Sequence, residues 1–237
     1  MPGMPVSDQT LSEARSYRSR AIEALLAEHF PRVQRMAYGL SGREDVGRGI
    51  VRFVMTRAAH NLPRWRDPDA AERWFYHHTV LTQRRSTKHE PDPRGDLLLT
   101  MDPQPDAAYA AFVRAIRSLP VQQREAYILS HGEHWNVRLV AIAMDCSTSA
   151  TDVHLKGAEQ ELSAVAGAAY PQFVQRFVNA YQRLTPTPES GGSAVSSYAT
   201  RIVAPRRAKR WLMLFVLVAL LAAAAWLGRD LLRSYLP

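Results

Sequence analysis

Residues 119–162 read LPVQQREAYILSHGEHWNVRLVAIAMDCSTSATDVHLKGAEQEL, and this stretch decides the fold that the sequence predicts. The apolar positions of NVRLVAIAM, residues 136–144, form the buried face of a short helix. A tight turn follows, and Ser147 or Ser149 caps a longer final helix. A short helix, a turn of three to four residues and a second helix make the geometry of a helix-turn-helix.

The segments on either side have the same helical spacing of apolar residues, without convincing β-type alternation. We therefore expect an all-α fold: two small helical domains, the second a helix-turn-helix, joined by a linker, plus one C-terminal transmembrane helix. Stretches rich in Pro, Ser and Gly give the boundaries. We expect a helical domain at 9–88, a linker at 89–105, the helix-turn-helix domain at 106–165, an additional helix at 166–184, a flexible basic tether at 185–210, the transmembrane helix at 211–228 and a short extracytoplasmic tail at 229–237.

The chain is strongly basic, with 30 Lys and Arg against 22 Asp and Glu, a formal net charge of +8 and a pI near 10.0. This balance favours an anionic partner, either nucleic acid or the anionic face of a membrane. Cys146 is the one cysteine of the chain, which excludes an internal disulfide and a zinc site built from cysteines.

Residues 211–228, WLMLFVLVALLAAAAWLG, form an unbroken apolar run. As a helix this run is roughly 27 Å long, close to the hydrocarbon thickness of a bilayer. The preceding flank, RIVAPRRAKR, is much more basic than the following one, so the positive-inside rule predicts that both helical domains lie in the cytoplasm. We expect a single-pass protein of the cytoplasmic membrane that contacts the lipid bilayer through 211–228.

The helix-turn-helix stretch resembles the promoter-binding domain of extracytoplasmic-function RNA polymerase sigma factors. The matching residues are Leu119, Pro120, Arg124, Glu125, Ala141, Cys146, Ser147, Leu155, Ala158 and Leu162. The first domain is similar to the N-terminal domain of that family, including Asp45 and the run from Arg66 to Pro68 that leads to Trp74. The two resemblances lie in the family's order and together cover most of residues 17–165.

The resemblance implies that the first domain binds core RNA polymerase and melts the downstream promoter element, while the last helix of the second reads the upstream element. Aromatic and Arg side chains suit the first task, because they stack on unpaired bases and track phosphates. The DNA contacts that the resemblance implies are Arg64, Trp74, Tyr76, Arg84, Arg85, Lys88, Arg138, Ser147, Thr148, Ser149, Thr151, His154 and Lys156. The polymerase contacts that it implies are Asp45, Arg48, Arg52 and Met55.

The sequence departs from the family pattern at both implied surfaces. Gly47 to Arg52, GRGIVR, stand where the family has acidic residues that grip the polymerase. Asp152, Gly157 and Glu159 stand in the final helix where basic residues are common. If three such cations each contacted a phosphate, their loss would lower the slope of log K for DNA binding against log salt concentration by about 2.7.

Enzyme and metal-site interpretations have little support in the residues. The stretch HGEH at 131–134 and the pair His77–His78 lack the i, i+4 histidine spacing with an intervening Glu that a metallohydrolase helix requires. There is also no phosphate-binding glycine loop and no nucleophile elbow. We predict a protein that is not an enzyme and has no metal site and no cofactor.

Two hypotheses about function remain. The first is a membrane-tethered sigma-like regulator that brings polymerase to promoter DNA, controlled by a regulatory protein or by a protease that cleaves the tether. In this case the helix at 166–184 packs on the second domain through Phe173, Phe177 and Tyr181, and masks the recognition helix. The second is a sigma-derived adaptor at the membrane that has lost promoter recognition and binds a protein partner.

Overall fold

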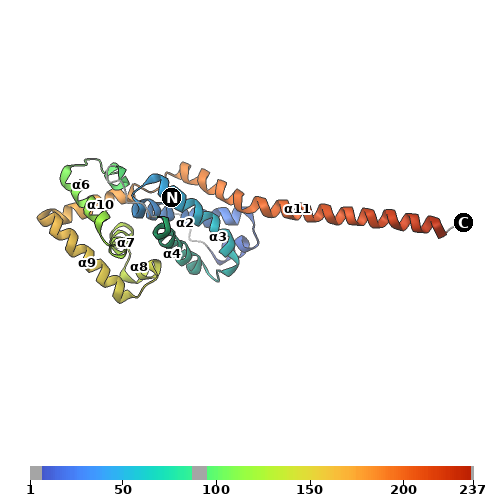
Figure 1. Ribbon diagram of the computed structural model, residues 1–237, viewed down its shortest axis with the longest axis horizontal. Coiled ribbons are helices and arrows are strands. Elements are labelled where there is room, and N and C mark those ends of the chain that lie inside the picture. Colours follow the sequence, from blue (N-terminus) through green and yellow to red (C-terminus); the bar gives the residue numbers. More distant parts are fainter. Residues whose placement is uncertain (1–6, 87–94, 236–237) are drawn as a thin grey trace.

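The computed structural model describes residues 7–86 and 95–235, and of residues 206, 207, 210 and 225–235 it describes the backbone alone. The described residues form helices and connecting turns without a strand, which confirms the all-α prediction. Helices α1 to α10 form the body of the molecule, and α11 runs along this body and then projects far beyond it (Figure 1).

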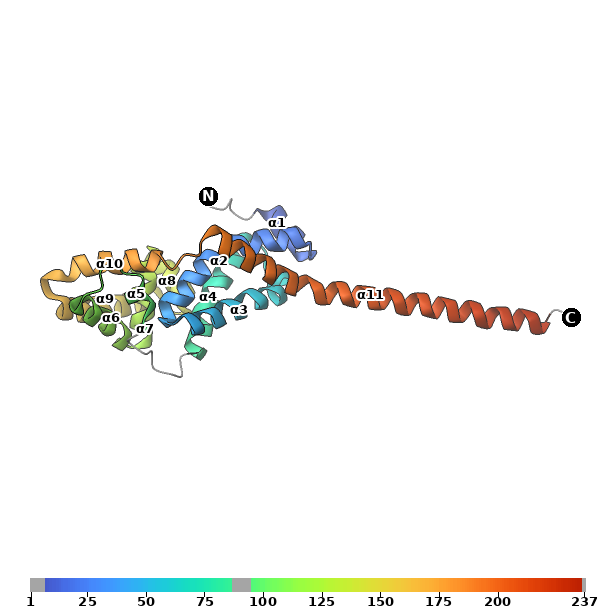
Figure 2. The same ribbon diagram turned by 90° about the horizontal axis from the view of Figure 1, so that it is seen from above.

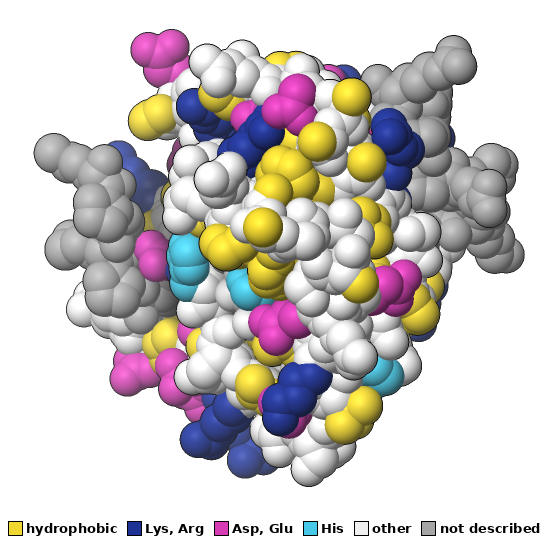
Figure 3. All heavy atoms as spheres, turned by 90° about the vertical axis from the view of Figure 1, so that its left-hand side faces the viewer, with side chains coloured by type: hydrophobic (Ala, Val, Ile, Leu, Met, Phe, Trp, Pro, Cys, Tyr) yellow, Lys and Arg dark blue, Asp and Glu magenta, His cyan; other side chains and the backbone are white. Residues whose placement is uncertain are grey.

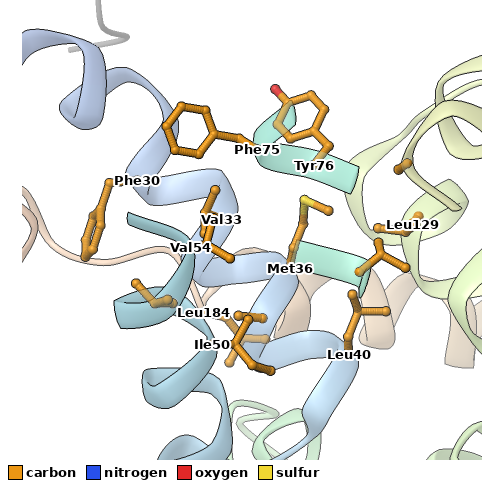
Figure 4. Packing of buried hydrophobic residues seen from close by; sticks show 14 of the residues in the cluster. Phe30, Val33, Met36, Leu40, Ile50, Val54, Phe75, Tyr76, Leu129 and Leu184 are labelled. Carbon is orange, nitrogen blue, oxygen red and sulfur yellow. The ribbon is translucent and has the colours of Figure 1, made fainter. Parts of the chain in front are cut away.

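The first half of the chain is organised around one long central helix. Its helices are α1 (Asp8–Arg15), α2 (Ser19–Ser41), α3 (Glu44–Asn61) and α4 (Pro68–Ser86). The central helix is α2, because α1, α3 and α4 all pack against it. Buried side chains at this packing interface include Phe30, Val33, Met36, Leu40, Ile50, Val54 and Phe75 (Figure 4).

The turn that follows α2 joins the first half of the chain to the second. Gly42 has a φ of 68°, a left-handed conformation that glycine adopts without steric cost. A Cβ at this position would lie 2.6 Å from a carboxylate oxygen of Asp96 and 2.8 Å from the Arg117 guanidinium group. Asp96 and Arg117 are buried and form hydrogen bonds of 2.5 and 3.1 Å. Arg117 also donates to the Gly39 carbonyl at 2.8 Å, so one buried guanidinium group connects both halves.

The second half of the chain contains the predicted helix-turn-helix. Its helices are α5 (Leu97–Thr100), α6 (Ala107–Ser118), α7 (Val121–Tyr127), α8 (Val137–Met144), α9 (Thr148–Ala166) and α10 (Tyr170–Gln182), with a π-helical turn at Ile128–Gly132. Helix α8 ends at Met144, the next residue Asp145 has a φ of 56°, and α9 begins after Ser147. The Ser147 hydroxyl accepts a 3.1 Å hydrogen bond from the Ala150 N–H, so the predicted cap is confirmed.

The additional helix at 166–184 corresponds to α10 and packs on the second half of the chain as predicted. Phe177 is fully buried, with its ring centroid 5.5 Å from that of Tyr127, and Phe173 lies 5.4 Å from Phe112. Tyr181 is fully buried too, and it reaches Gly39 of α2 as well as its own half. Helix α10 therefore contacts both halves of the body.

The two predicted domains are in close contact with each other. Their buried apolar residues belong to one continuous cluster, and α4 packs directly against α8. Tyr76 of the first half and Trp135 of the second have ring centroids 4.6 Å apart. Asp96 and Leu98, which fall in the predicted linker, are buried between the halves, so this part of the linker is a packed segment.

The prediction of a flexible tether at 185–210 is wrong for the described residues. Helix α11 (Pro188–Tyr235) begins there and packs along α2 and α3, as Figure 2 also shows. The buried side chains are Val195, Ala199, Ile202 and Val203, an i, i+4, i+7, i+8 spacing typical of a helix that rests on a core. The high content of Ser, Gly and Pro concealed this apolar stripe.

Within the side chains that the structure describes, no helix combines the length and apolar character needed to cross a membrane. The predicted span at 211–228 continues beyond residue 224, and its last four side chains lie outside the described part.

Candidate nucleic-acid interface

Helix α8, the turn after it and α9 expose most of the polar side chains that were predicted to contact DNA in the second half of the chain. The exposed members of this set are Arg138, Ser147, Thr148, Ser149 and Lys156. Helix α10 packs against the second half of α9 and leaves Ser147, Thr148 and Ser149 exposed, so the prediction that it masks the recognition helix is wrong. The start of α9 is therefore exposed to solvent.

The charge on this surface is partly neutralised by the protein itself. Lys156 donates to Asp152 at 2.7 Å, one helical turn away, and this hydrogen bond raises the pKa of the Lys156 ammonium group. Further along α9, Glu159 lies 3.0 Å from the His131 ring. Arg138, in contrast to Lys156, forms no ion pair with another described residue.

Thr151 does not belong to the DNA surface, and this part of the prediction is wrong. Its side chain is fully buried, and its hydroxyl donates to the Ser147 carbonyl at 3.0 Å and also lies 3.0 Å from Cys146 Sγ. Thr151 thus stabilises the turn before α9 from the inside. His154 is half-buried on the same helix.

Arg84 was also predicted to contact DNA, but it binds the second half of its own chain. Its guanidinium group donates to both oxygens of Glu125 at 2.6 to 3.1 Å and to the Met144 carbonyl at 3.1 Å. Burial raises the pKa of the Glu125 carboxyl, and the hydrogen bond from Arg84 partly offsets this effect. In this arrangement the end of α4 is held against α7 and α8.

Tyr76 and Trp74 are held by neighbouring side chains and are not available as base-stacking platforms in this arrangement. Tyr76 is buried, its hydroxyl donates to Glu72 and accepts from Arg32, and burial raises its pKa. Trp74 is half-buried and stacks on His78 with ring centroids 4.1 Å apart. Tyr76 therefore belongs to the hydrophobic core, and Trp74 is a partly buried residue packed against it.

A second ionic contact reinforces the junction between the halves. Glu133 has a side chain that is 1% exposed, and it accepts two hydrogen bonds from Arg35, at 2.9 and 2.6 Å. The Tyr181 hydroxyl donates to the same carboxylate at 3.0 Å. We use the term domain junction for the contacts Arg84–Glu125, Arg35–Glu133 and Tyr76–Trp135.

The residues predicted to bind polymerase divide into an exposed set and a buried one. Asp45 pairs with Arg43 at 2.8 Å, and Arg48 pairs with Glu44, both at the exposed start of α3. Arg52 is exposed one turn further on. Met55 is fully buried in the hydrophobic core, so its predicted contact with polymerase is wrong.

Arg64 and Arg85, the remaining members of the predicted DNA set, are exposed in the first half of the chain. Lys88 lies outside the described residues. The structure thus brings together the predicted contacts around α9 but not those around α4.

No protein-family model, curated protein or solved structure matches the chain. Sequence reasoning missed two acidic residues, Glu125 and Glu133, that direct Arg84 and Arg35 into the domain junction. The signal for Glu125 was present, since it is one of the residues that match the sigma-factor pattern and it directly precedes the apolar run that starts at Ala126.

Proposed function

We propose that this chain is a membrane-tethered, sigma-like regulator that binds promoter DNA through α8 and α9 and recruits core RNA polymerase. The observation that carries the proposal is the exposed start of α9, with Arg138 and the hydroxyl groups of Ser147, Thr148 and Ser149 around a turn of helix-turn-helix geometry. Cations and hydroxyl groups in this position are suited to phosphate contacts that hold a recognition helix in the major groove.

The domain junction implies that the first half of the chain is inactive toward DNA in the arrangement described. Arg84 is occupied by Glu125, and Tyr76 by Glu72, Arg32 and Trp135. Separation of α4 from α7 and α8 would release this surface for an unpaired DNA strand. The proposed regulator is thus closed at rest and opens when polymerase or another partner competes for the junction.

The membrane tether is supported by the exposed apolar part of α11. Residues 211–224 are all exposed, with Trp211 70% and Phe215 71% accessible, on the part of the helix that projects from the body (Figure 1). An exposed apolar surface of this extent is typical of a segment that contacts lipid or another protein. We propose that it inserts into the cytoplasmic membrane with the body on the cytoplasmic side.

The proposal is tested by the salt dependence of binding to duplex promoter DNA, measured by fluorescence anisotropy with the full chain in nanodiscs. Arg138→Gln removes one phosphate contact and should lower the slope of log K against log salt by about 0.9. Arg114→Gln removes one exposed charge from α6, away from the turn, and should leave the slope unchanged. Equal slopes for the two variants would show that α8 and α9 do not bind DNA.

A second candidate function is a protein-binding adaptor, and one feature of α9 favours it. Val153 and Val165 of α9 are 67% and 53% exposed, and Asp152 neutralises Lys156. Figure 3 shows the end of the molecule away from the projecting part of α11, where apolar side chains gather in a central band with charges of both signs around it. Such a mixed surface is typical of a protein interface.

Affinity capture separates the two functions. The regulator should capture core RNA polymerase and lose none of it when Val153 is changed to Lys. The adaptor should capture a different protein, and Val153→Lys should abolish this capture because it places a charge in the apolar contact. Val153→Lys should not affect the fold, since Val153 is largely solvent-exposed.

A further inference from the structure

An open pocket lined by arginines lies where α3, the end of α4 and α11 meet. Its cavity volume is about 740 Å³, and each of the three helices contributes one guanidinium group, from Arg52, Arg85 and Arg201. No Asp or Glu is among the described residues that line it. Phe53 is also part of the wall and is 46% exposed, which is unusual for an aromatic side chain in the described part of α1 to α10.

These three arginines differ from the arginines of the domain junction. Arg35 and Arg84 each bind a buried carboxylate, as described above. Within the described part of the chain, none of the three pocket guanidinium groups forms an ion pair. Three like charges around one cavity repel each other, so the pocket is complementary to an anion.

The position of Arg201 on α11 indicates where that anion comes from. Arg201 precedes Trp211 by ten residues, a distance of about 15 Å along a helix. The headgroup layer on one side of a bilayer is roughly 6 Å thick. The remaining distance of roughly 9 Å is close to one Debye length at physiological ionic strength.

A proline in α11 allows the pocket to approach the headgroup layer. Pro205 lies inside α11, between Arg201 and the apolar run. Proline lacks the N–H that would bond to the carbonyl four residues earlier, which is that of Arg201. Sharp helix bends occur at such positions, so the body can lean toward the membrane about this point.

We propose that the pocket binds the phosphate of an anionic phospholipid headgroup in the leaflet that α11 enters, an inference that rests on the membrane tether proposed above. Arginine binds phosphate oxygens in a bidentate manner, and the exposed ring of Phe53 is suited to the boundary between headgroups and acyl chains. The cytoplasmic leaflet carries the anionic lipids, and each basic residue near it strengthens binding by about fivefold.

Headgroup binding would compete with the other partners of the protein. Arg52 belongs to the predicted polymerase surface, and Arg85 to the predicted DNA surface. A membrane rich in anionic lipid therefore holds these two surfaces against the bilayer, and a fall in anionic lipid releases them.

The test uses the full chain in nanodiscs of neutral phosphatidylcholine, with and without added phosphatidylglycerol. Amide hydrogen exchange is followed in residues 49–56 and 82–86, which form the pocket walls. Phosphatidylglycerol should slow this exchange in the wild-type chain by about fivefold. Arg201→Gln should remove most of the effect, while Arg114→Gln, an equal loss of charge on α6, should retain it.

The possible failures are distinguishable. A chain that does not enter neutral discs overturns the membrane tether and this inference with it. A chain that enters them without dependence on phosphatidylglycerol, or with equal effects of the two variants, overturns the headgroup site alone. If a single-stranded oligonucleotide protects the same residues in neutral discs in an Arg201-dependent manner and phosphatidylglycerol does not, the pocket is a nucleic-acid site and the lipid assignment is wrong.

Discussion

The ion pair between Arg84 and Glu125 allows a quantitative test of the domain junction. The Glu125 side chain is 1% exposed and takes three hydrogen bonds from Arg84, whose side chain is 29% exposed. Removal of one partner of a buried ion pair costs about 3 to 5 kcal/mol, because the other charge is left buried. Since water reaches Arg84 and can relax into its place, we expect Arg84→Met to cost about 3 kcal/mol.

The other variants complete a double-mutant cycle. Glu125→Leu leaves a guanidinium group that can turn into solvent, so we expect a loss of about 1 kcal/mol. The double variant replaces the pair by apolar groups of similar size, which we also expect to cost about 1 kcal/mol. The coupling free energy between the two residues is then about 3 kcal/mol.

The measurement is unfolding of the full chain in mild detergent by guanidinium chloride, followed by circular dichroism. The matched control is the exposed pair of Asp152 and Lys156, for which a coupling free energy of about 0.5 kcal/mol or less is expected. If the effects of Arg84→Met and Glu125→Leu add to within about 0.5 kcal/mol, the junction is not held by this pair and the closed arrangement is wrong.

Three further predictions concern the body and α11. Gly42→Ala should lower the free energy of unfolding by at least about 2 kcal/mol, since φ is 68° and the added Cβ meets Asp96. The control is Gly49→Ala, which has open space around the added Cβ and should be neutral or stabilising in the same denaturation assay. Equal effects of the two variants would contradict this account. Burial lowers the pKa of His29 to about 4, so below pH 6.5 the His29 ring is protonated in the unfolded chain but stays neutral in the folded chain until the pH reaches about 4. The free energy of unfolding should therefore fall by up to about 3 kcal/mol as the pH falls from 6.5 to 4. His29→Gln should remove this pH dependence in thermal melting measured over the same pH range. If the variant keeps the wild-type pH profile, His29 is not responsible for it. Ile202→Ser should speed amide exchange in residues 195–203, because it removes buried apolar contact between α11 and the body, whereas unchanged exchange would mean that this part of α11 is not held by its apolar stripe.

The helix-turn-helix could be predicted from sequence because its determinants are local. The cap at Ser147 and the apolar face of α8 depend on residues within one or two helical turns of each other. The packing of α10 was predictable for the same reason, since its large aromatic residues lie on one face.

The role of Arg84 could not be predicted, because its partner Glu125 lies 41 residues away in the chain. A basic residue at the end of a helix looks the same in sequence whether it faces solvent or a buried carboxylate. Tyr76 illustrates the same limit, as its ring packs on Trp135 from the other half. The resemblance implied DNA contacts for Arg84 and Tyr76, and the structure places both in the domain junction instead.

The first part of α11 was mispredicted for a different reason. Its Ser, Gly and Pro residues indicate a flexible tether, yet Val195, Ala199, Ile202 and Val203 repeat at helical spacing. Tertiary packing against α2 outweighs the low helix propensity of the residues between them. Periodicity was the better guide here, and composition was the weaker one.

Run-off transcription with core RNA polymerase is the most direct test of the proposed regulator. The full chain in nanodiscs is added to polymerase and genomic promoter fragments, beside Glu125→Gln, which frees Arg84 from the domain junction. The account predicts transcripts that require the chain, increase with Glu125→Gln and decrease with Arg138→Gln. Absence of chain-dependent transcripts from wild type and both variants, together with failure to bind core polymerase, would contradict it.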